Sequence, residues 1–285
     1  MASGTYDYGA NANLGCNFEV YSKVQIIMID IHVQQRLREQ YNPEGSARRE
    51  LQLQLLEILK EFDSICTKHQ IPYWIDSGTL IGAVRHGGFI PWDDDIDVCI
   101  LKRDQARLRE VMLRELREPM RYIDRKVDRS YARKWPRIVK SEVVTDVHGN
   151  QQGIWLDVFI MEYGNRRLFN LVNQTYGRCF RRQSGLIVES PLRKLLVSIV
   201  SPLCWLIMQC ARCWGRCFCR NTLIFDYGGI FHSIRKMDEI FPLTRIEFEG
   251  VSFSAPAHSD RYLRRIYGDY MSLPAECLRI THNLV

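Results

Sequence analysis

Four aspartates lie within five consecutive positions of this 285-residue chain, namely Asp93, Asp94, Asp95 and Asp97. They open onto an apolar stretch at 96–101, whose composition is typical of a strand. Because residues i and i+2 of a strand point to the same face, Asp95 and Asp97 are expected to present two carboxylates side by side. Such a pair would bind Mg²⁺ or Mn²⁺. A bare Asp-x-Asp pair is also typical of a solvated acidic turn.

A third acid, Asp157, favours the metal-binding interpretation. It lies inside the apolar stretch 154–159, where an isolated carboxylate is costly unless it is paired or bound to a metal. Three carboxylates on adjacent strands would form a divalent-metal site suited to phosphoryl or nucleotidyl transfer. The spacing does not decide whether Asp93 or Asp94 also reaches the metal, or whether both only support its ligands.

A glycine-containing turn upstream is a candidate phosphate site. Ser77, Gly78 and Thr79 lie at a predicted junction between a strand and a helix. Backbone N–H groups at the start of a helix favour a phosphate, and glycine lets the phosphate approach closely. A simple helix cap is the alternative. A glycine turn followed by Asp-x-Asp and a later third acid is the pattern of the nucleotidyltransferase fold.

Three basic side chains are further candidates for contact with phosphate: Arg85, His86 and Arg137. Arg137 belongs to a stretch, 121–140, that carries eight basic residues, so a solvated hairpin face is its alternative role. His86 follows the predicted helix and could equally brace the loop.

The elements that must position these residues indicate an α+β fold, with helices, a mixed sheet and then a helical part. We expect helices at 24–40, 46–69 (with Ser46 as N-cap), 78–85, 105–116 and 260–267, and a mostly helical stretch at 163–240. We expect strands at 73–75, 96–101 and 153–161 and a hairpin at 246–254. Residues 121–147 alternate as strands do, and a turn at 148–150 closes them.

The composition, 46% apolar and 25% charged, provides enough apolar mass for a core and excludes disordered and collagen-like classes. A net charge of +6 with no recognised module argues against nucleic acid as a partner.

The N-terminal stretch lacks the pattern of a signal peptide, and ten cysteines favour reduced thiols. We therefore expect a cytoplasmic protein, with the cysteines at 204–219 as small core residues rather than a zinc site.

Residues 195–211 are apolar apart from two serines and one glutamine, with Pro202 near the middle. This stretch is just short of a comfortable membrane span, so a buried or membrane-interface helix is favoured and a true span is the alternative. Between 163 and 220 the chain carries ten basic residues and one acid. We expect peripheral membrane contact through 190–220, on the inner membrane face.

The aspartate segment closely resembles the signature of the LicD family, GTLLGA-RH-GFIPWDDDID. Here residues 78–97 read GTLIGAVRHGGFIPWDDDID, and IWLDVFIME at 154–162 is similar to the family's third-carboxylate strand. A later block also resembles the family, through Phe248-Glu249-Gly250, Pro256, Tyr262-Leu263, Tyr267-Gly268-Asp269-Tyr270-Met271 and Pro274. The resemblance covers 46–162 and 241–283 and leaves 163–240 unaccounted for.

LicD proteins are nucleotidyltransferase-fold phosphotransferases related to fukutin-type enzymes. The resemblance therefore implies a mixed sheet flanked by helices. It implies transfer of phosphocholine or a phosphopolyol from a CDP-linked alcohol donor to a hydroxyl of a cell-surface glycan or glycolipid. It also implies that Asp95 and Asp97 hold the metal, with Asp157 as a third ligand or as a base. Gly78 and Thr79 would cradle the donor phosphate.

We expect four parts in the chain: a disordered N-terminus at 1–22, the catalytic core with its N-terminal helices at 23–162, a helical region at 163–240 that shapes the acceptor pocket or contacts a membrane, and a hairpin and helix block at 241–285.

Two other functions stay open. One is a nucleotidyltransferase that transfers a nucleoside monophosphate, and the other is a non-catalytic glycan- or lipid-binding protein with the same fold.

Overall fold

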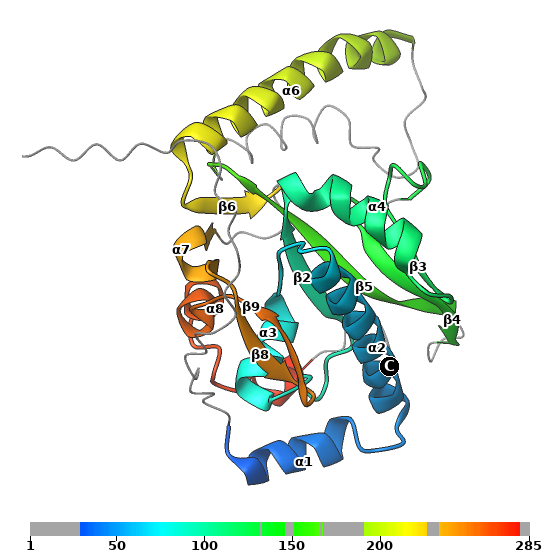
Figure 1. The fold of residues 1–285 in the computed structure, drawn as a ribbon, viewed down its shortest axis with the longest axis vertical. Helices are drawn as coiled ribbons and strands as arrows, with labels where there is room; N and C mark the ends of the chain where they lie inside the picture. Colours follow the sequence, from blue (N-terminus) through cyan, green and yellow to red (C-terminus); the bar gives the residue numbers. More distant parts are fainter. Residues whose placement is uncertain are drawn as a thin grey trace, which may run out of the picture.

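The computed structural model describes residues 29–131, 133–145, 151–165, 167, 191–226 and 234–279. Within them, helices surround a mixed sheet (Figure 1), which confirms the predicted α+β class. The predicted disordered N-terminus at 1–22 and the predicted turn at 148–150 lie outside the described residues. The helix expected at 24–40 is described from its middle onward, as α1 (Ile31–Tyr41).

The sheet places the two acidic strands next to each other. Its strands run in the order β1 (Tyr73–Ile75), β2 (Ile96–Leu101), β5 (Gln151–Tyr163), β4 (Arg137–Thr145) and β3 (Met120–Ile123). Only the β2–β5 pair is parallel among the strand pairs of the described residues. A parallel pair needs a crossover connection, and here the connection contains α4 (Gln105–Glu115), β3 and β4.

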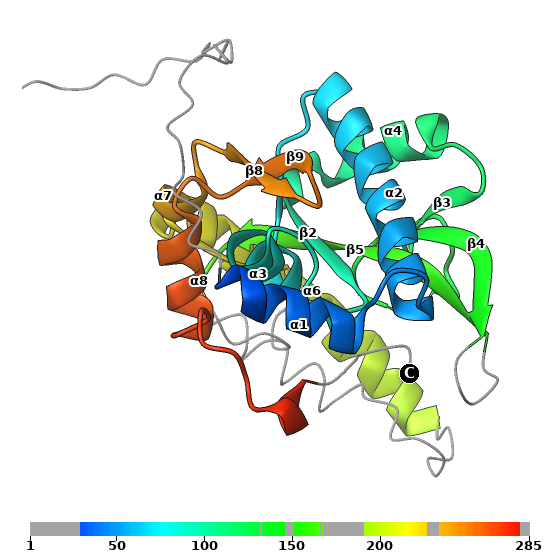
Figure 2. The same cartoon turned by 90° about the horizontal axis from the view of Figure 1, so that it is seen from below.

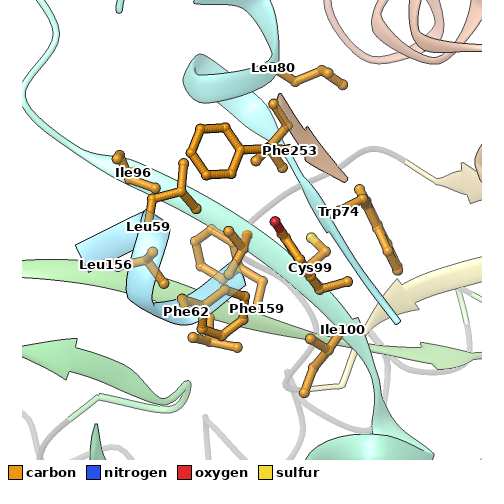
Figure 3. Close-up of a cluster of buried hydrophobic side chains, with 14 of the residues drawn as sticks. Leu59, Phe62, Trp74, Leu80, Ile96, Cys99, Ile100, Leu156, Phe159 and Phe253 are labelled. Atoms are coloured by element: carbon orange, nitrogen blue, oxygen red, sulfur yellow. The ribbon is translucent and has the colours of Figure 1, made fainter. Parts of the chain in front are cut away.

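The long helix α2 (Ala47–Lys68) covers the sheet with its apolar face. The Ser46 hydroxyl accepts a hydrogen bond from the Arg49 N–H at 3.2 Å, which confirms Ser46 as the N-cap. Leu59 and Phe62 of α2 belong to the same buried cluster as Leu156 of β5 (Figure 3), and all three are fully buried. This burial fixes the face of β5 on which α2 lies.

A small hairpin supports the other end of the core. It joins β8 (Thr244–Phe248) to β9 (Val251–Ala255) through Glu249 and Gly250, both with positive φ, as a two-residue hairpin turn requires. The Glu249 carboxylate accepts from the Phe89 N–H at 3.0 Å and pairs with Arg49 at 2.9 Å. The hairpin therefore holds the loop after α3 (Ser77–His86) against the start of α2.

The stretch 163–240, predicted to be mostly helical, contains strands as well as helices. Beside α6 (Pro191–Phe218) and α7 (Met237–Ile240), it holds β6 (Thr222–Phe225) and β7 (Arg235–Lys236). β6 extends the sheet by pairing with the end of β5 from Met161 to Tyr163. A four-residue run cannot be assigned to helix or strand by periodicity alone, so these two short strands were not predicted within the mostly helical stretch.

The remaining described helix, α8 (Ser259–Tyr267), confirms the helix expected at 260–267 and packs near α7 (Figure 2). No helix among the described residues is both long and apolar enough to span a membrane.

Gly82 of α3 tests the packing of this helix against its following loop. A Cβ atom at Gly82 would lie 2.4 Å from the backbone oxygen of Gly88, and backbone cannot move aside as a side chain can. We expect Gly82→Ala to lower the free energy of unfolding by about 1–3 kcal/mol. Gly153→Ala, whose Cβ would lie 3.6 Å from the nearest atom, is the control in urea unfolding. Equal free energies of unfolding for the two variants would contradict the close contact between α3 and the loop at Gly88.

Candidate active site

The candidate site lies where β1 leads into α3 and β2 begins. The N–H of Asp76 donates to the carbonyl of Asp97 at 2.9 Å, directly after the last β1–β2 pair. The N–H of Asp97 in turn donates to the Thr79 hydroxyl at 2.9 Å. These two bonds hold the first turn of α3 against the first residues of β2, so the predicted turn and the predicted aspartates meet.

The parallel register brings the second and third acids together. Asp97 of β2 lies directly beside Asp157 of β5, and laterally paired residues of adjacent strands point to the same face. Asp93 and Asp94 are buried in the turn before β2. A Cβ atom at Gly78 would lie 2.5 Å from a carboxylate oxygen of Asp93. Only glycine therefore lets the start of α3 approach this carboxylate so closely.

The aspartates are close enough to oppose one another's ionisation. Burial raises the pKa of Asp93 well above its usual range, and the charges of Asp95 and Asp94 raise it further. Burial also raises the pKa of Asp97, and so do the charges of Asp95 and Asp157. Asp93 and Asp95 are hydrogen-bonded through their side chains. Carboxylates gathered in this way need a proton or a cation between them.

The donor set fits a hard divalent cation, because Mg²⁺ and Mn²⁺ prefer carboxylate oxygens. Among the described residues, no three His, Cys, Asp or Glu side chains are already arranged as a metal-ligand set. Mg²⁺ is usually held by one or two carboxylates together with substrate phosphates rather than by a complete protein cage. Asp95 and Asp97 would be those carboxylates, with Asp93 and Asp94 supporting them.

Asp157 is oriented by two donors on neighbouring segments. Arg137 of β4 binds it with both branches of its guanidinium, with Nε 2.5 Å from Oδ1 and Nη2 3.1 Å from Oδ2. The indole N–H of Trp135 donates to Oδ1 at 2.6 Å. The Arg137 guanidinium also stacks 4.2 Å from the centre of the Trp155 ring. Arg137 therefore contacts the third carboxylate, and its predicted contact with donor phosphate stays a prediction.

A fully buried ion pair lies beneath the start of α3. Arg235 Nη2 is 2.9 Å from Asp76 Oδ2, and the Tyr262 hydroxyl donates to Asp76 Oδ1 at 2.6 Å. Burial opposes the ionisation of Asp76, but the charge of Arg235 and the bonds from Tyr262 and Cys99 outweigh it, so the pKa of Asp76 lies below its usual value. Asp76 is thus a fixed anion that anchors the turn to the C-terminal part of the chain.

Arg85 and His86 are engaged in the core. The Arg85 guanidinium donates to the backbone oxygen of Tyr270 at 2.6 Å and to His86 Nε2 at 2.9 Å. The other ring nitrogen of His86 lies 2.5 Å from Gln34 Oε1. Burial, with the charges of Arg85 and Arg38, lowers the pKa of His86 to about 3. These contacts support the bracing role of His86 and leave contact with phosphate a prediction for both residues.

Four side chains join the site without having been predicted there. Arg235 comes from the stretch that the resemblance leaves unaccounted for, and Trp135 from the loop before β4. Tyr262 of α8 bonds to Asp76, and Tyr267, at the end of α8, is hydrogen-bonded to Ser77, whose φ of 49° is positive. Only the two tyrosines carried a signal, because they belong to the C-terminal motif. Positions so far apart in sequence give no local pattern that links them.

The chain can now be compared with known proteins. Residues 70–183 match the model of the LicD/FKTN/FKRP nucleotidyltransferase domain. The chain is 29% identical over 245 residues to the lipopolysaccharide cholinephosphotransferase LicD of Haemophilus influenzae, covering 80% of this chain and 92% of that protein. It is 50% identical over 34 residues to the human ribitol 5-phosphate transferase FKRP, which is 12% of this chain and 7% of that protein.

The match at 70–183 contains β1, the turn at the start of α3, β2 and β5. Residues 70–183 therefore match the nucleotidyltransferase-domain model of the LicD family, which confirms the resemblance carried by the aspartate segment. The site described above lies in the matched segment, apart from Arg235, Tyr262 and Tyr267, which follow it in the chain.

The buried pair beneath α3 gives a prediction about stability. Arg235→Met would leave the Asp76 carboxylate buried without its cation, so we expect the free energy of unfolding to fall by about 3–5 kcal/mol. The control Arg264→Met breaks an exposed pair with Asp260 and should cost at most about 1 kcal/mol. Asp76→Asn combined with Arg235→Met should recover part of the loss. If Arg235→Met and Arg264→Met lowered the free energy of unfolding equally in chemical denaturation, the stabilising role of the buried Arg235–Asp76 pair would be refuted.

The low pKa of His86 predicts a pH dependence. Its imidazole is neutral in the folded protein but takes up a proton in the unfolded chain below about pH 6.5. Stability should therefore fall as the pH drops from 6.5 toward 3, and His86 alone should contribute a loss of about 2 kcal/mol by pH 5. We expect His86→Gln to show a shallower decline in denaturation midpoint over this range. Parallel profiles for the two proteins would show that His86 titrates normally.

Proposed function

We propose that this protein transfers a phospho-alcohol, phosphocholine or a phosphopolyol, from a CDP-linked donor to a hydroxyl of a glycan or glycolipid. The observation that carries the proposal is the pairing of Asp97 with Asp157 beside Asp93 and Asp95, inside a LicD-family domain. The relatives support the substrate class: one is named as a cholinephosphotransferase of lipopolysaccharide and another as a ribitol 5-phosphate transferase.

The reaction exchanges one phosphorus–oxygen bond for another. The acceptor hydroxyl oxygen bonds to the phosphorus that carries the alcohol, the bond from that phosphorus to the bridging oxygen breaks, and CMP leaves with that oxygen. A divalent cation held by Asp95 and Asp97 would neutralise charge on the donor phosphates. Ser77, Gly78 and Thr79 offer the N–H groups at the start of α3 to the same phosphates.

The acceptor hydroxyl must be oriented and lose its proton. Asp157 Oδ1 receives bonds from both Trp135 and Arg137, whereas Oδ2 receives one from Arg137. A carboxylate oxygen accepts two hydrogen bonds, so Oδ2 has capacity for the acceptor hydroxyl. Of the two roles expected for Asp157, this favours hydrogen bonding to the acceptor and taking its proton. Arg137 and Trp135 then act as positioning residues.

The first test measures CMP release from CDP-choline, CDP-ribitol and CDP-glycerol, each with Mg²⁺, with Mn²⁺ and with a chelator. We expect release from one donor that stops on chelation, because charge on the leaving phosphates would no longer be neutralised. Asp97→Asn should lower the rate at least about a hundredfold, with an unchanged unfolding midpoint. Glu57→Gln, an exposed acid on α2, is the matched control and should keep full activity.

The products separate this proposal from its alternatives. Pyrophosphate release from a nucleoside triphosphate, without CMP release from any CDP-linked donor, would indicate a nucleotidyltransferase. Full activity of Asp97→Asn would remove the proposed metal site. A thermal shift with CDP-choline and Mg²⁺ but no turnover on addition of glycan acceptors would indicate a binding protein.

A further inference from the structure

Helix α6 presents an apolar face to solvent. Trp205, Leu206, Trp214 and Phe218 are 64%, 52%, 54% and 70% exposed. Cys210, Cys213 and Cys217 are exposed as well, and at helical spacing they lie along the same side as Leu206. In Figure 1, α6 runs along the upper edge of the molecule, with β6 beneath its C-terminal part. Exposed apolar surface of this extent marks an interaction site.

The opposite side of α6 is fixed to the sheet. Ala211 and Met208 pack against Ile224 of β6. A Cβ atom at Gly215 would lie 2.2 Å from the backbone oxygen of Tyr163, so the helix approaches the end of β5 very closely. The small residues are therefore the inner face, and the large apolar side chains are the outer face.

Two ion pairs along the side of α6 hold this orientation. Arg212 pairs with Asp226 after β6 at 2.8 Å, and Arg216 pairs with Glu162 of β5 at 2.7 Å. Rotating the helix to bury Leu206 would break both pairs and expose Ala211. The outward apolar face, defined here as Trp205, Leu206, Trp214 and Phe218, is thus built into the fold.

We propose that this outward apolar face docks onto the surface of an anionic membrane, with α6 lying in the interface. Pro191–Phe218 contains no Asp or Glu, and the stretch 163–220 carries ten basic residues and one acid. Pro191–Phe218 itself carries Arg193, Lys194, Arg212 and Arg216, and a helix of net positive charge with exposed tryptophans complements anionic headgroups and the interfacial layer beneath them. Because its inner face is packed against β5 and β6, the helix would lie along the membrane surface.

The charge also decides against a second copy of this chain as the occupant. Two copies meeting through the outward apolar face would bring together two α6 helices, each with four basic residues and no acid, and like charges at an interface oppose association. An anionic lipid surface, in contrast, attracts the basic residues and also accepts the apolar side chains. The proposal goes beyond the proposed function, because docking depends on α6 and not on the aspartates.

The test is flotation of the full chain with phosphatidylcholine vesicles, with and without phosphatidylglycerol. We expect the protein to float with the mixed vesicles, to stay behind with phosphatidylcholine alone, and to dissociate at high salt. Leu206→Glu with Trp214→Glu should weaken partitioning at least about tenfold. The matched control, Ile31→Glu with Leu113→Glu, makes the same change at exposed residues of α1 and α4 and should float as the wild type does.

Quenching of wild-type tryptophan fluorescence by brominated phosphatidylglycerol vesicles gives a second measurement that needs no variant. The proposal is overturned if the wild type does not float with mixed vesicles, or if the α6 variant floats as well as its control. A dimer in sedimentation velocity that the α6 variant abolishes would also overturn it, because the face would then belong to a second copy. CMP release is followed separately, so loss of docking and loss of turnover are distinguishable.

Discussion

The gathering of carboxylates at the start of β2 is the constraint on which the arrangement of the core depends. Parallel pairing sets Asp97 beside Asp157, and the turn before β2 adds Asp93 next to Asp95. Like charges in a poorly solvated place raise the free energy of the folded chain unless cations or protons compensate them. Each of the flanking acids accordingly has its own arginine, Arg137 for Asp157 and Arg235 for Asp76.

Arg235 comes from a segment far from Asp76 in sequence, so this charge pair also determines how the chain closes around the site. Arg235 reaches Asp76 from β7, and Tyr262 of α8 completes the same buried group. Arg137 of β4 is directly paired with Asp157 of β5, so the two side chains lie on the same face of the sheet. The site and the outer elements therefore stabilise one another.

Local patterns predicted most of the core and the aspartates. The apolar periodicity of α2, its N-cap at Ser46, and the strands β1, β2 and β5 were predicted correctly, because each depends on neighbouring residues. The bonds that orient the site were not predictable, since Arg235 and Asp76 are 159 positions apart. Arg85 and His86 illustrate the same point: their partners, Tyr270 and Gln34, are brought close only by folding. The roles of the aspartates in metal binding stay predictions.

Helix α6 shows why periodicity alone gives an incomplete account of a helix. An apolar stripe on a globular protein usually faces the core, and of the two roles expected for residues 195–211, a buried or a membrane-interface helix, the first assumed this. In the structure, Ala211 and Gly215 face inward because close contact with β5 and β6 needs small residues. The larger apolar side chains then have no room on that side. The orientation follows from backbone proximity and from the pairs at Glu162 and Asp226, which sequence periodicity does not encode.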